Sequence, residues 1–464
     1  MRKILKILSV IVGIFLIGAA AFYFAFLRGL PRPEIALQPI RFTGMEMPDQ
    51  HDCFWIGPVT IDAFNTAYPD EGAIYWPTVF KFPTDEADSH LEITGKYPEA
   101  RYMSYHSYTE GSAPYDHLND IGIVPDSGTQ NPFITGSFAP DQTYTIKVYP
   151  REQPETAPAN TLYLGPPDKI SSTPIILRNY VSEIEGDPSG GAGLPEVALV
   201  RANGDRVEGE TLCTLLNSPP VGDPDRYVAA PVIPREVYDK MIHNREVRDS
   251  ILKTKQEEWI IFWDPRVGIT RLMSPALSGM FKKLVRWGVF KKTSGFFANF
   301  DNEYVSMYIT EEFGEITVLK GKLPLTPATG AAGADVSGFD MRYWSLCTNE
   351  GLATTRFTDC VYDSKVTVDE EQNYTIVISK PGNRPANATE ECGVTWMDFG
   401  EKGDGAGNEM ISILILRNML HNPGFTHAVQ NIPRVGDEKL TMGAYLPIPE
   451  YTDQASFEAR GCKP

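Results

Sequence analysis

The residues in this 464-residue chain that are best suited to chemistry are two histidines with aspartates beside them. His106 and His117 flank a predicted hairpin, next to Asp116 and Asp120. Such groups can form a general acid–base pair or part of a metal site. A hydrolase-type enzyme would use His106, His117 and Asp120. The pair lacks the i, i+4 helical spacing of a metalloprotease motif, so surface or hydrogen-bonded loop histidines are the alternative, and we expect no metal site.

Two further features lack the spacing of a known active site. His421 and His427 follow a predicted strand late in the chain and are also compatible with loop histidines. The Gly-rich stretch 186–195 has neither Gly-x-Gly-x-x-Gly spacing nor a Walker A pattern, so it predicts a wide surface loop or, alternatively, an anion-cradling nest. The chain has no Gly-x-Ser-x-Gly elbow. We therefore expect no cofactor.

Arginines recur at matching places in the two halves of the chain. They are Arg101 and Arg342, and Arg178 and Arg417. Each lies within or at the end of a predicted strand. The four side chains could face a duplicated ligand cleft. A structural role is the simpler expectation, in which each arginine pairs with a carboxylate such as Asp120 or Asp359 and fixes the end of a strand.

Six cysteines are spread over the chain. They are Cys53, Cys213, Cys347, Cys360, Cys392 and Cys462. No two have the Cys-x-x-Cys spacing of zinc or redox sites. An even number in an oxidising compartment predicts up to three disulfides, with 15 possible connectivities among which the sequence does not choose.

Residues 266–300 form a local charge inversion, with seven Lys or Arg and no Asp or Glu. On a helix over 274–289, apolar and basic side chains fall on opposite arcs, which is typical of a helix in a membrane interface. The candidate binding residues are Phe281, Lys282, Lys283, Leu284, Arg286 and Trp287. The alternatives are a helix packed on the acidic body, or one that fits a groove of a partner protein.

The elements that must position these residues are predicted to be mainly β-strands. Short alternating or apolar runs, such as 78–82, 144–148 and 411–416, are separated by turn clusters rich in Pro, Asp and Gly. This rhythm is typical of a sandwich or barrel. Helices are predicted only between the two β-rich parts, over 234–259 and 274–289, the second opening with a Ser-Pro cap.

Four short motifs recur in the same order in both halves. Gly-Lys-x-Pro, Arg-Tyr-x-Ser, Tyr-Thr-Ile and Leu-Arg-Asn begin at 95, 101, 144 and 177, and again at 321, 342, 374 and 416. The offsets are 226, 241, 230 and 239, so the spacers differ while the order persists. The pattern predicts two duplicated β-sandwich domains joined by a helical insertion.

The strand 342–346, Arg-Tyr-Trp-Ser-Leu, resembles a strand of the bacterial domain-of-unknown-function 1214/1254 family. The matching strand of the first half, 101–105, is a looser match because Met103 and Tyr105 replace Trp and Leu. The resemblance covers about two strands in each half. It implies a jelly-roll-like sandwich and carries no established activity.

The N-terminus is predicted to be an uncleaved transmembrane anchor. Residues 7–27 are 21 uncharged, mostly apolar residues, enough to span a bilayer, and they continue past the small residues 18–21 where a signal peptide would be cleaved. A cleaved signal is the alternative. Arg2, Lys3 and Lys6 precede the run, so the N-terminus is expected in the cytoplasm and the remainder outside.

The net charge of −18 becomes −22 for the exported part once Arg2, Lys3, Lys6 and Arg28 are removed. So acidic a body argues against nucleic acid as a partner. We expect an anchor (1–28), a linker and lead-in (29–69), a first sandwich (70–220), a basic helical insertion (221–300), a second sandwich (301–435) and a tail (436–464). The leading function is a membrane-anchored extracytoplasmic binding protein for a lipid, glycan or partner protein. The alternatives are an accessory subunit of a membrane complex and the enzyme above.

Overall fold

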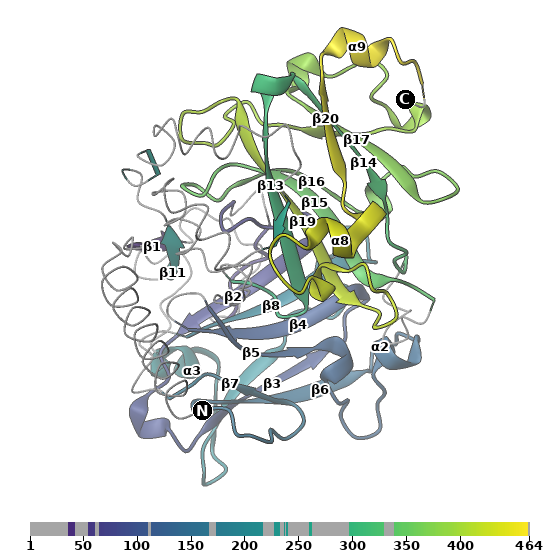
Figure 1. The fold of residues 1–464 in the computed structure, drawn as a ribbon. Coiled ribbons are helices and arrows are strands. Elements are labelled where there is room, and N and C mark those ends of the chain that lie inside the picture. Colours follow the sequence, from purple (N-terminus) through teal and green to yellow (C-terminus); the bar gives the residue numbers. More distant parts are fainter. Residues whose placement is uncertain are drawn as a thin grey trace, which may run out of the picture.

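The computed structural model is mostly β, with four sheets of four or five strands, one two-stranded sheet and few helices (Figure 1). It describes residues 36–41, 54–60, 65–109, 113–166, 173–216, 227–232, 236, 238–239, 259–261, 297–328 and 338–462. We call the sheets formed by residues 73–208 the first half, and those formed by residues 260–452 the second half.

The first half contains two sheets. One consists, in spatial order, of β2 (Ala73–Phe80), β8 (Thr173–Ser182), β4 (Ala100–Tyr108) and β5 (Pro114–Asn119). The other consists of β10 (Arg206–Glu208), β9 (Glu196–Val200), β3 (His90–Lys96), β6 (Thr143–Tyr149) and β7 (Thr161–Tyr163). All neighbours are antiparallel except β6 and β7, which are parallel.

The second half has two sheets with a corresponding strand order. One consists of β12 (Ile260–Ile261), β13 (Asn302–Thr310), β19 (Ile411–His421), β15 (Met341–Asn349) and β16 (Phe357–Tyr362). The other consists of β18 (Thr395–Asp398), β17 (Asn373–Ser379), β14 (Ile316–Lys322) and β20 (Ile448–Thr452). Its one parallel pair, β17 with β18, matches β6 with β7. The strands that carry Tyr-Thr-Ile, β6 and β17, therefore occupy corresponding positions.

Each half buries apolar side chains contributed by both of its sheets. In the first half Trp76, Leu91 and Ile146 belong to one buried cluster, and in the second half Trp344, Ile376 and Leu416 belong to another. The alternation of a strand places every second residue in such a cluster. The motif strands β4 and β15 are nevertheless buried along their whole length, because their second face is also covered.

The repeated Gly-Lys-x-Pro motif has a packing reason in both halves. A Cβ on Gly95 would lie 2.5 Å from the Tyr144 hydroxyl oxygen, and one on Gly321 would lie 2.6 Å from that of Tyr374. No other residue fits at these positions without displacing a buried tyrosine.

The described helices are short. They are α2 (Pro132–Thr135), α3 (Gly209–Leu215), α8 (Glu438–Met442) and α9 (Gln454–Glu458). The 3₁₀ turns are η2 (Thr84–Glu86), η3 (Asp120–Gly122), η4 (Glu311–Phe313), η6 (Asp363–Lys365), η7 (Pro381–Asn383), η8 (Glu390–Cys392), η9 (Val429–Asn431) and η10 (Gly443–Tyr445). Within the described residues, none of the helices has the length and apolar character needed to cross a bilayer.

Four described segments outside the expected sandwiches are strands, among them β12 in the expected helical insertion. β1 (Ala36–Arg41), within the expected linker, pairs with β11 (Tyr227–Val232), within the expected helical insertion. β20, within the expected tail, pairs with β14. The anchor 7–27, the basic helix 274–289 with its six candidate binding residues, and most of the helix 234–259 lie outside the described residues.

Candidate functional site

The two halves meet through the faces of β4 and β15 that point away from their cores. Tyr102 of β4 and Tyr343 of β15 belong to one buried cluster with Ala73, Tyr180 and Met419, so the cluster draws on both halves. In Figure 1, the second-half strands β13, β15 and β19 lie beside the first-half sheet of β2, β8 and β4. We call this contact the joint.

Arginine–aspartate pairs cross the joint reciprocally. Arg101, the second residue of β4, pairs with Asp363 of η6. Arg342, the second residue of β15, donates from Nη1 to Asp120 Oδ1 of η3 at 2.7 Å. The side chains of all four residues are at most 2% exposed. Each half thus supplies one arginine and one aspartate to the other.

Each of these aspartates also holds a strand of its own half. Asp120 Oδ2 accepts from the Met103 backbone N–H at 2.8 Å, and Asp363 Oδ2 accepts from that of Trp344 at 3.0 Å. Burial raises the pKa of Asp120, and the Arg342 guanidinium opposes this rise. Three hydrogen bonds from the protein thus engage Asp120, because Oδ1 also accepts from the Ile121 N–H.

A third carboxylate, Asp70, lies in the second-half side of the joint. Its Oδ1 accepts from the Tyr343 hydroxyl at 2.6 Å, and its Oδ2 accepts from the Ser345 hydroxyl at 2.6 Å. Arg417 Nε lies 3.6 Å from Oδ2. A side chain from before β2 is therefore bound by residues of β15 and β19.

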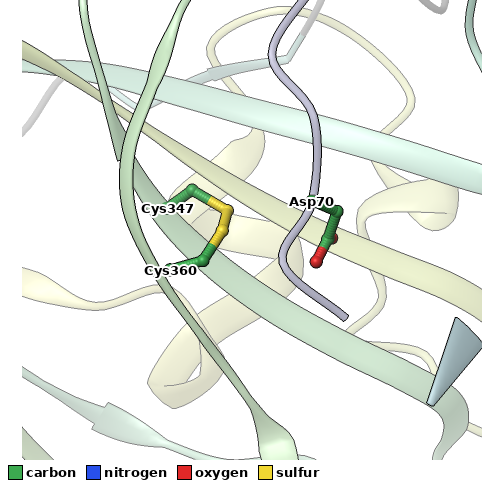
Figure 2. Close-up of side chains that lie close together, drawn as sticks. All are labelled: Asp70, Cys347 and Cys360. Atoms are coloured by element: carbon green, nitrogen blue, oxygen red, sulfur yellow. A yellow bond between two sulfur atoms is a disulfide. The ribbon is translucent and has the colours of Figure 1, made fainter. Parts of the chain in front are cut away.

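The Cys347–Cys360 disulfide lies next to Asp70 (Figure 2). Together the three residues are the one group of potential metal ligands of at least three side chains in the described part of the chain. A metal would need the cysteines as thiolates, whereas here their sulfurs are bonded to each other. Arg417 Nη1 also lies 2.7 Å from Cys347 Sγ, and a cation beside the sulfur opposes a second cation.

The histidines nominated as catalytic occupy the corresponding place in the first half. His106 and His117 are cross-strand partners on β4 and β5, as Cys347 and Cys360 are on β15 and β16. The imidazoles stack, with ring centroids 5.3 Å apart. The structure thus brings the histidine pair together, but as part of the joint.

Two groups of the second half contact the histidine pair. His106 is fully buried and its Nε2 accepts from the Phe300 N–H at 3.0 Å. Burial and the neighbouring Arg178 hold the pKa of His106 well below its ordinary value, so the ring is neutral near pH 7. His117 Nε2 lies 3.6 Å from Asp301 Oδ1.

Asp301, which precedes β13, binds residues of the first half in the same way that Asp70 binds residues of the second half. Its Oδ2 accepts from the Tyr102 hydroxyl at 2.7 Å and from Asn119 Nδ2 at 2.9 Å. Burial alone would raise the pKa of Asp301, but the bonds from His117, Asn119 and Tyr102 outweigh burial and lower it. The aspartate is therefore a charged acceptor that links the halves.

The other nominated residues lie elsewhere or have structural partners. His427 bonds to the Thr441 carbonyl through Nδ1 at 2.8 Å and stacks on Tyr445. The Gly-rich loop 186–195 closes on its own Asp187, which accepts from the N–H groups of Ser189 and Gly191. Asp359 accepts from two backbone N–H groups and pairs with no repeated arginine among the described residues.

The sequence did not single out three carboxylates of the joint, Asp70, Asp301 and Asp363. Asp363 had a usable signal, because it follows β16 as Asp120 follows β5. Asp70 precedes β2 and Asp301 precedes β13, which occupies the corresponding place in the second half, but no recurring motif marks them.

Two disulfides are described in full and a third cysteine is bonded. Cys392 pairs with Cys462, 70 residues later, and Cys347 pairs with Cys360. Cys213 is also disulfide-bonded, while Cys53 lies outside the described residues.

Comparison with known proteins shows remote likeness to solved structures. No protein-family model matches the chain, and no curated protein matches it. A putative uncharacterized protein from Burkholderia cenocepacia is 9% identical, with a TM-score of 0.45, and the match covers 87% of this chain and 82% of that one. The VPA0106 protein from Vibrio parahaemolyticus is 10% identical, with a TM-score of 0.35 over 77% of this chain and 86% of that one.

Proposed function

We propose that this protein is a non-catalytic, membrane-anchored extracytoplasmic binding protein. One observation carries the proposal: two of the three side chains nominated as catalytic, His106 and Asp120, are completely buried in the joint, and the third, His117, faces Asp301. Asp120 accepts from Arg342 and from two backbone N–H groups, and His106 is buried beneath Phe300. A general base must lie within reach of a substrate, and both of these side chains are completely buried.

The cysteines support the extracytoplasmic part of the proposal. Cys347–Cys360 and Cys392–Cys462 are disulfide-bonded, and such bonds persist in the periplasm or outside the cell rather than in a reducing cytosol. The positive flank and the apolar run 7–27 supply the anchor and its orientation.

The fold proposal goes further than a β-rich class. We infer two jelly-roll-like β-sandwiches that arose by duplication, because the strand orders correspond and the repeated motifs occupy corresponding strands. The reciprocal arginine–aspartate pairs support the same inference, since each half contributes the same two residue types to the joint. The body is then a rigid platform that carries the segment 266–300.

The ligand of this platform is proposed to be an anionic membrane surface, met by the helix that the sequence predicts over 274–289. The test is flotation of the body without residues 1–28 on vesicles containing anionic lipid. Each Lys or Arg near such a surface contributes about 1 kcal/mol. Changing Lys282, Lys283 and Arg286 together to Glu should therefore abolish flotation of a body that otherwise binds.

A matched control changes the net charge of the protein by the same amount at other positions. Lys81, Lys96 and Lys402 are exposed on the described body, and changing all three to Glu alters the charge by the same amount. This control should float like the unchanged body. Equal flotation of the 282/283/286 variant, or none by the unchanged body, would reject the lipid ligand and leave a glycan or a partner protein.

A further inference from the structure

Two buried hydrogen-bond donors in the first-half side of the joint have no acceptor. Arg178 is 2% exposed and its Nη1 has no hydrogen-bond partner, and His106 is 0% exposed and its Nδ1 has none. Arg178 of β8 lies close enough to lower the pKa of His106 on the adjacent strand β4. Buried donors of this kind are costly to leave unpaired, particularly on a charged group.

The tautomer of His106 follows from its known bond. Because Nε2 accepts from the Phe300 N–H, the proton of the neutral ring resides on Nδ1. Nδ1 is then a donor and cannot accept from Arg178, whose guanidinium has donors only. Tyr108 also lies beside Arg178 and Asn299 beside His106, but neither takes up Arg178 Nη1 or His106 Nδ1. An acceptor between these two atoms would satisfy both.

The second half shows what fills the corresponding place. Arg417 corresponds to Arg178, and it has the Asp70 carboxylate at 3.6 Å, in addition to the Tyr68 carbonyl at 2.8 Å. Ser345, which corresponds to Ser104, donates to the same carboxylate. A carboxylate of the chain itself thus satisfies the second-half arginine and serine.

Among the described residues, no such carboxylate lies beside Arg178. In the described part of the chain Arg178 makes a bond to the Phe297 carbonyl at 2.6 Å but no ion pair. The nearest counterpart of Asp70, Asp301, is bound by Tyr102, Asn119 and His117 instead. Ser104 Oγ is buried on the same face of β4, beside the Tyr102 side chain.

We propose that a small monovalent anion, a halide or a simple carboxylate such as formate, binds between Arg178 Nη1 and His106 Nδ1, with Ser104 Oγ beside it. The anion takes the role that Asp70 plays in the second half. It neutralises a buried guanidinium and accepts from both donors at once. The site belongs to the joint, so occupancy stabilises the contact between the halves.

The first test is thermal unfolding of the full-length protein in detergent at constant ionic strength. Chloride, bromide or formate should raise the midpoint saturably relative to isethionate, a larger monovalent anion, because a ligand that binds only the folded state stabilises it. Arg178→Met should abolish the dependence. Arg417→Met, the matched change in the half that has its own carboxylate, should retain it.

The second test needs no variant and so does not depend on how a variant folds. In crystals of the unmodified protein grown with bromide, anomalous scattering should place a bromide in contact with Arg178 and His106, and none beside Arg417. Midpoints that do not differ between chloride and isethionate, or a persisting dependence in Arg178→Met, would overturn the proposal. Finding a water molecule instead of a bromide beside Arg178 and His106 would also overturn the proposal.

Discussion

The residue types in the joint do not by themselves decide between a ligand site and a structural role. An arginine on a strand and an aspartate after a hairpin suit a ligand cleft as well as a buried ion pair. Burial decides between them, because Arg101, Arg342, Asp120 and Asp363 are almost completely inaccessible. At this depth a guanidinium without its carboxylate is an unpaired buried charge, which proteins tolerate poorly.

Removing either arginine should therefore be strongly destabilising. Arg101→Met and Arg342→Met leave Asp363 and Asp120 uncompensated, and each change should lower the free energy of unfolding by about 3–5 kcal/mol. Urea denaturation measures this. The control Arg206→Met breaks exposed pairs with Glu92 and Glu208 and should cost at most about 1 kcal/mol. Losses of similar size in all three variants would contradict the buried-pair account.

Asp359 provides a pH prediction. Burial raises its pKa to about 6, whereas in the unfolded chain it releases its proton near about 4. Between these values the folded state holds a proton that the unfolded state lacks, so this group's contribution to stability declines as pH rises from 4 to 6. Asp359→Asn should therefore remove a decline in the free energy of unfolding, of up to about 3 kcal/mol between pH 4 and 6.

The measurement is the free energy of unfolding from urea titrations at several pH values. The difference between Asp359→Asn and the unchanged protein should vary across pH 4–6. Asp88→Asn, at an exposed carboxyl, is the control. If the Asp359→Asn and Asp88→Asn curves run parallel to the unchanged protein, the carboxyl of Asp359 ionises as in the unfolded chain.

The candidate site was only partly predictable from residues. Arg342 was expected to pair with a carboxylate, and Asp120 is its partner. His106 and His117 were expected to lie together beside a hairpin, and they do, but the sequence cannot show that Phe300 covers them from the other half. Contacts of that kind join residues almost 200 positions apart, and no local pattern encodes them.

At the scale of elements, the strands were the most predictable part. Alternation and apolar runs identify β4, β6 and β19, because a strand buried on one or both faces leaves that signature. β1 and β20 were missed. Both segments contain Pro and show little alternation, so the sequence predicted a linker and a tail there. The segments are Ala-Leu-Gln-Pro-Ile-Arg and Ile-Pro-Glu-Tyr-Thr.

The tyrosine–glycine fit gives a prediction for β3 and β14. Gly95→Ala and Gly321→Ala place a methyl group against the hydroxyls of Tyr144 and Tyr374, and each should cost about 1–3 kcal/mol of stability. Gly382→Ala is the control, because nothing lies within 4 Å of its added Cβ. The control should be neutral or stabilise by up to about 1 kcal/mol. Chemical denaturation of the three variants decides, and a neutral Gly95→Ala would show that the fit is loose.

The Cys392–Cys462 disulfide should secure β20 and α9. It closes a loop of 70 residues, so removing it as Cys392→Ser/Cys462→Ser should cost about 2–4 kcal/mol. Hydrogen exchange should rise in β20 and α9 in that variant. The matched change Cys347→Ser/Cys360→Ser should leave exchange in β20 unaltered. Unchanged protection of β20 in the first variant would mean that its pairing with β14 suffices.

At the scale of the whole molecule, the reciprocal pairs make the two halves one body. Each half binds an arginine of the other, and tyrosines from both meet at the centre of the joint. The proposed function depends on this arrangement, because it assigns the polar residues of β4, β5 and β15 to assembly. What remains for binding is the surface of the platform and the segment 266–300.

Scanning calorimetry of the full-length protein most directly tests whether the reciprocal arginine–aspartate pairs join the two halves into one unit. The unchanged protein should unfold in one transition that includes both halves, since neither arginine can leave its aspartate while the other half stays folded. Arg101→Met/Arg342→Met should split this into two transitions, one for each half. A variant that still unfolds in a single transition at the original midpoint would contradict the account, because the arginines would then not join the halves.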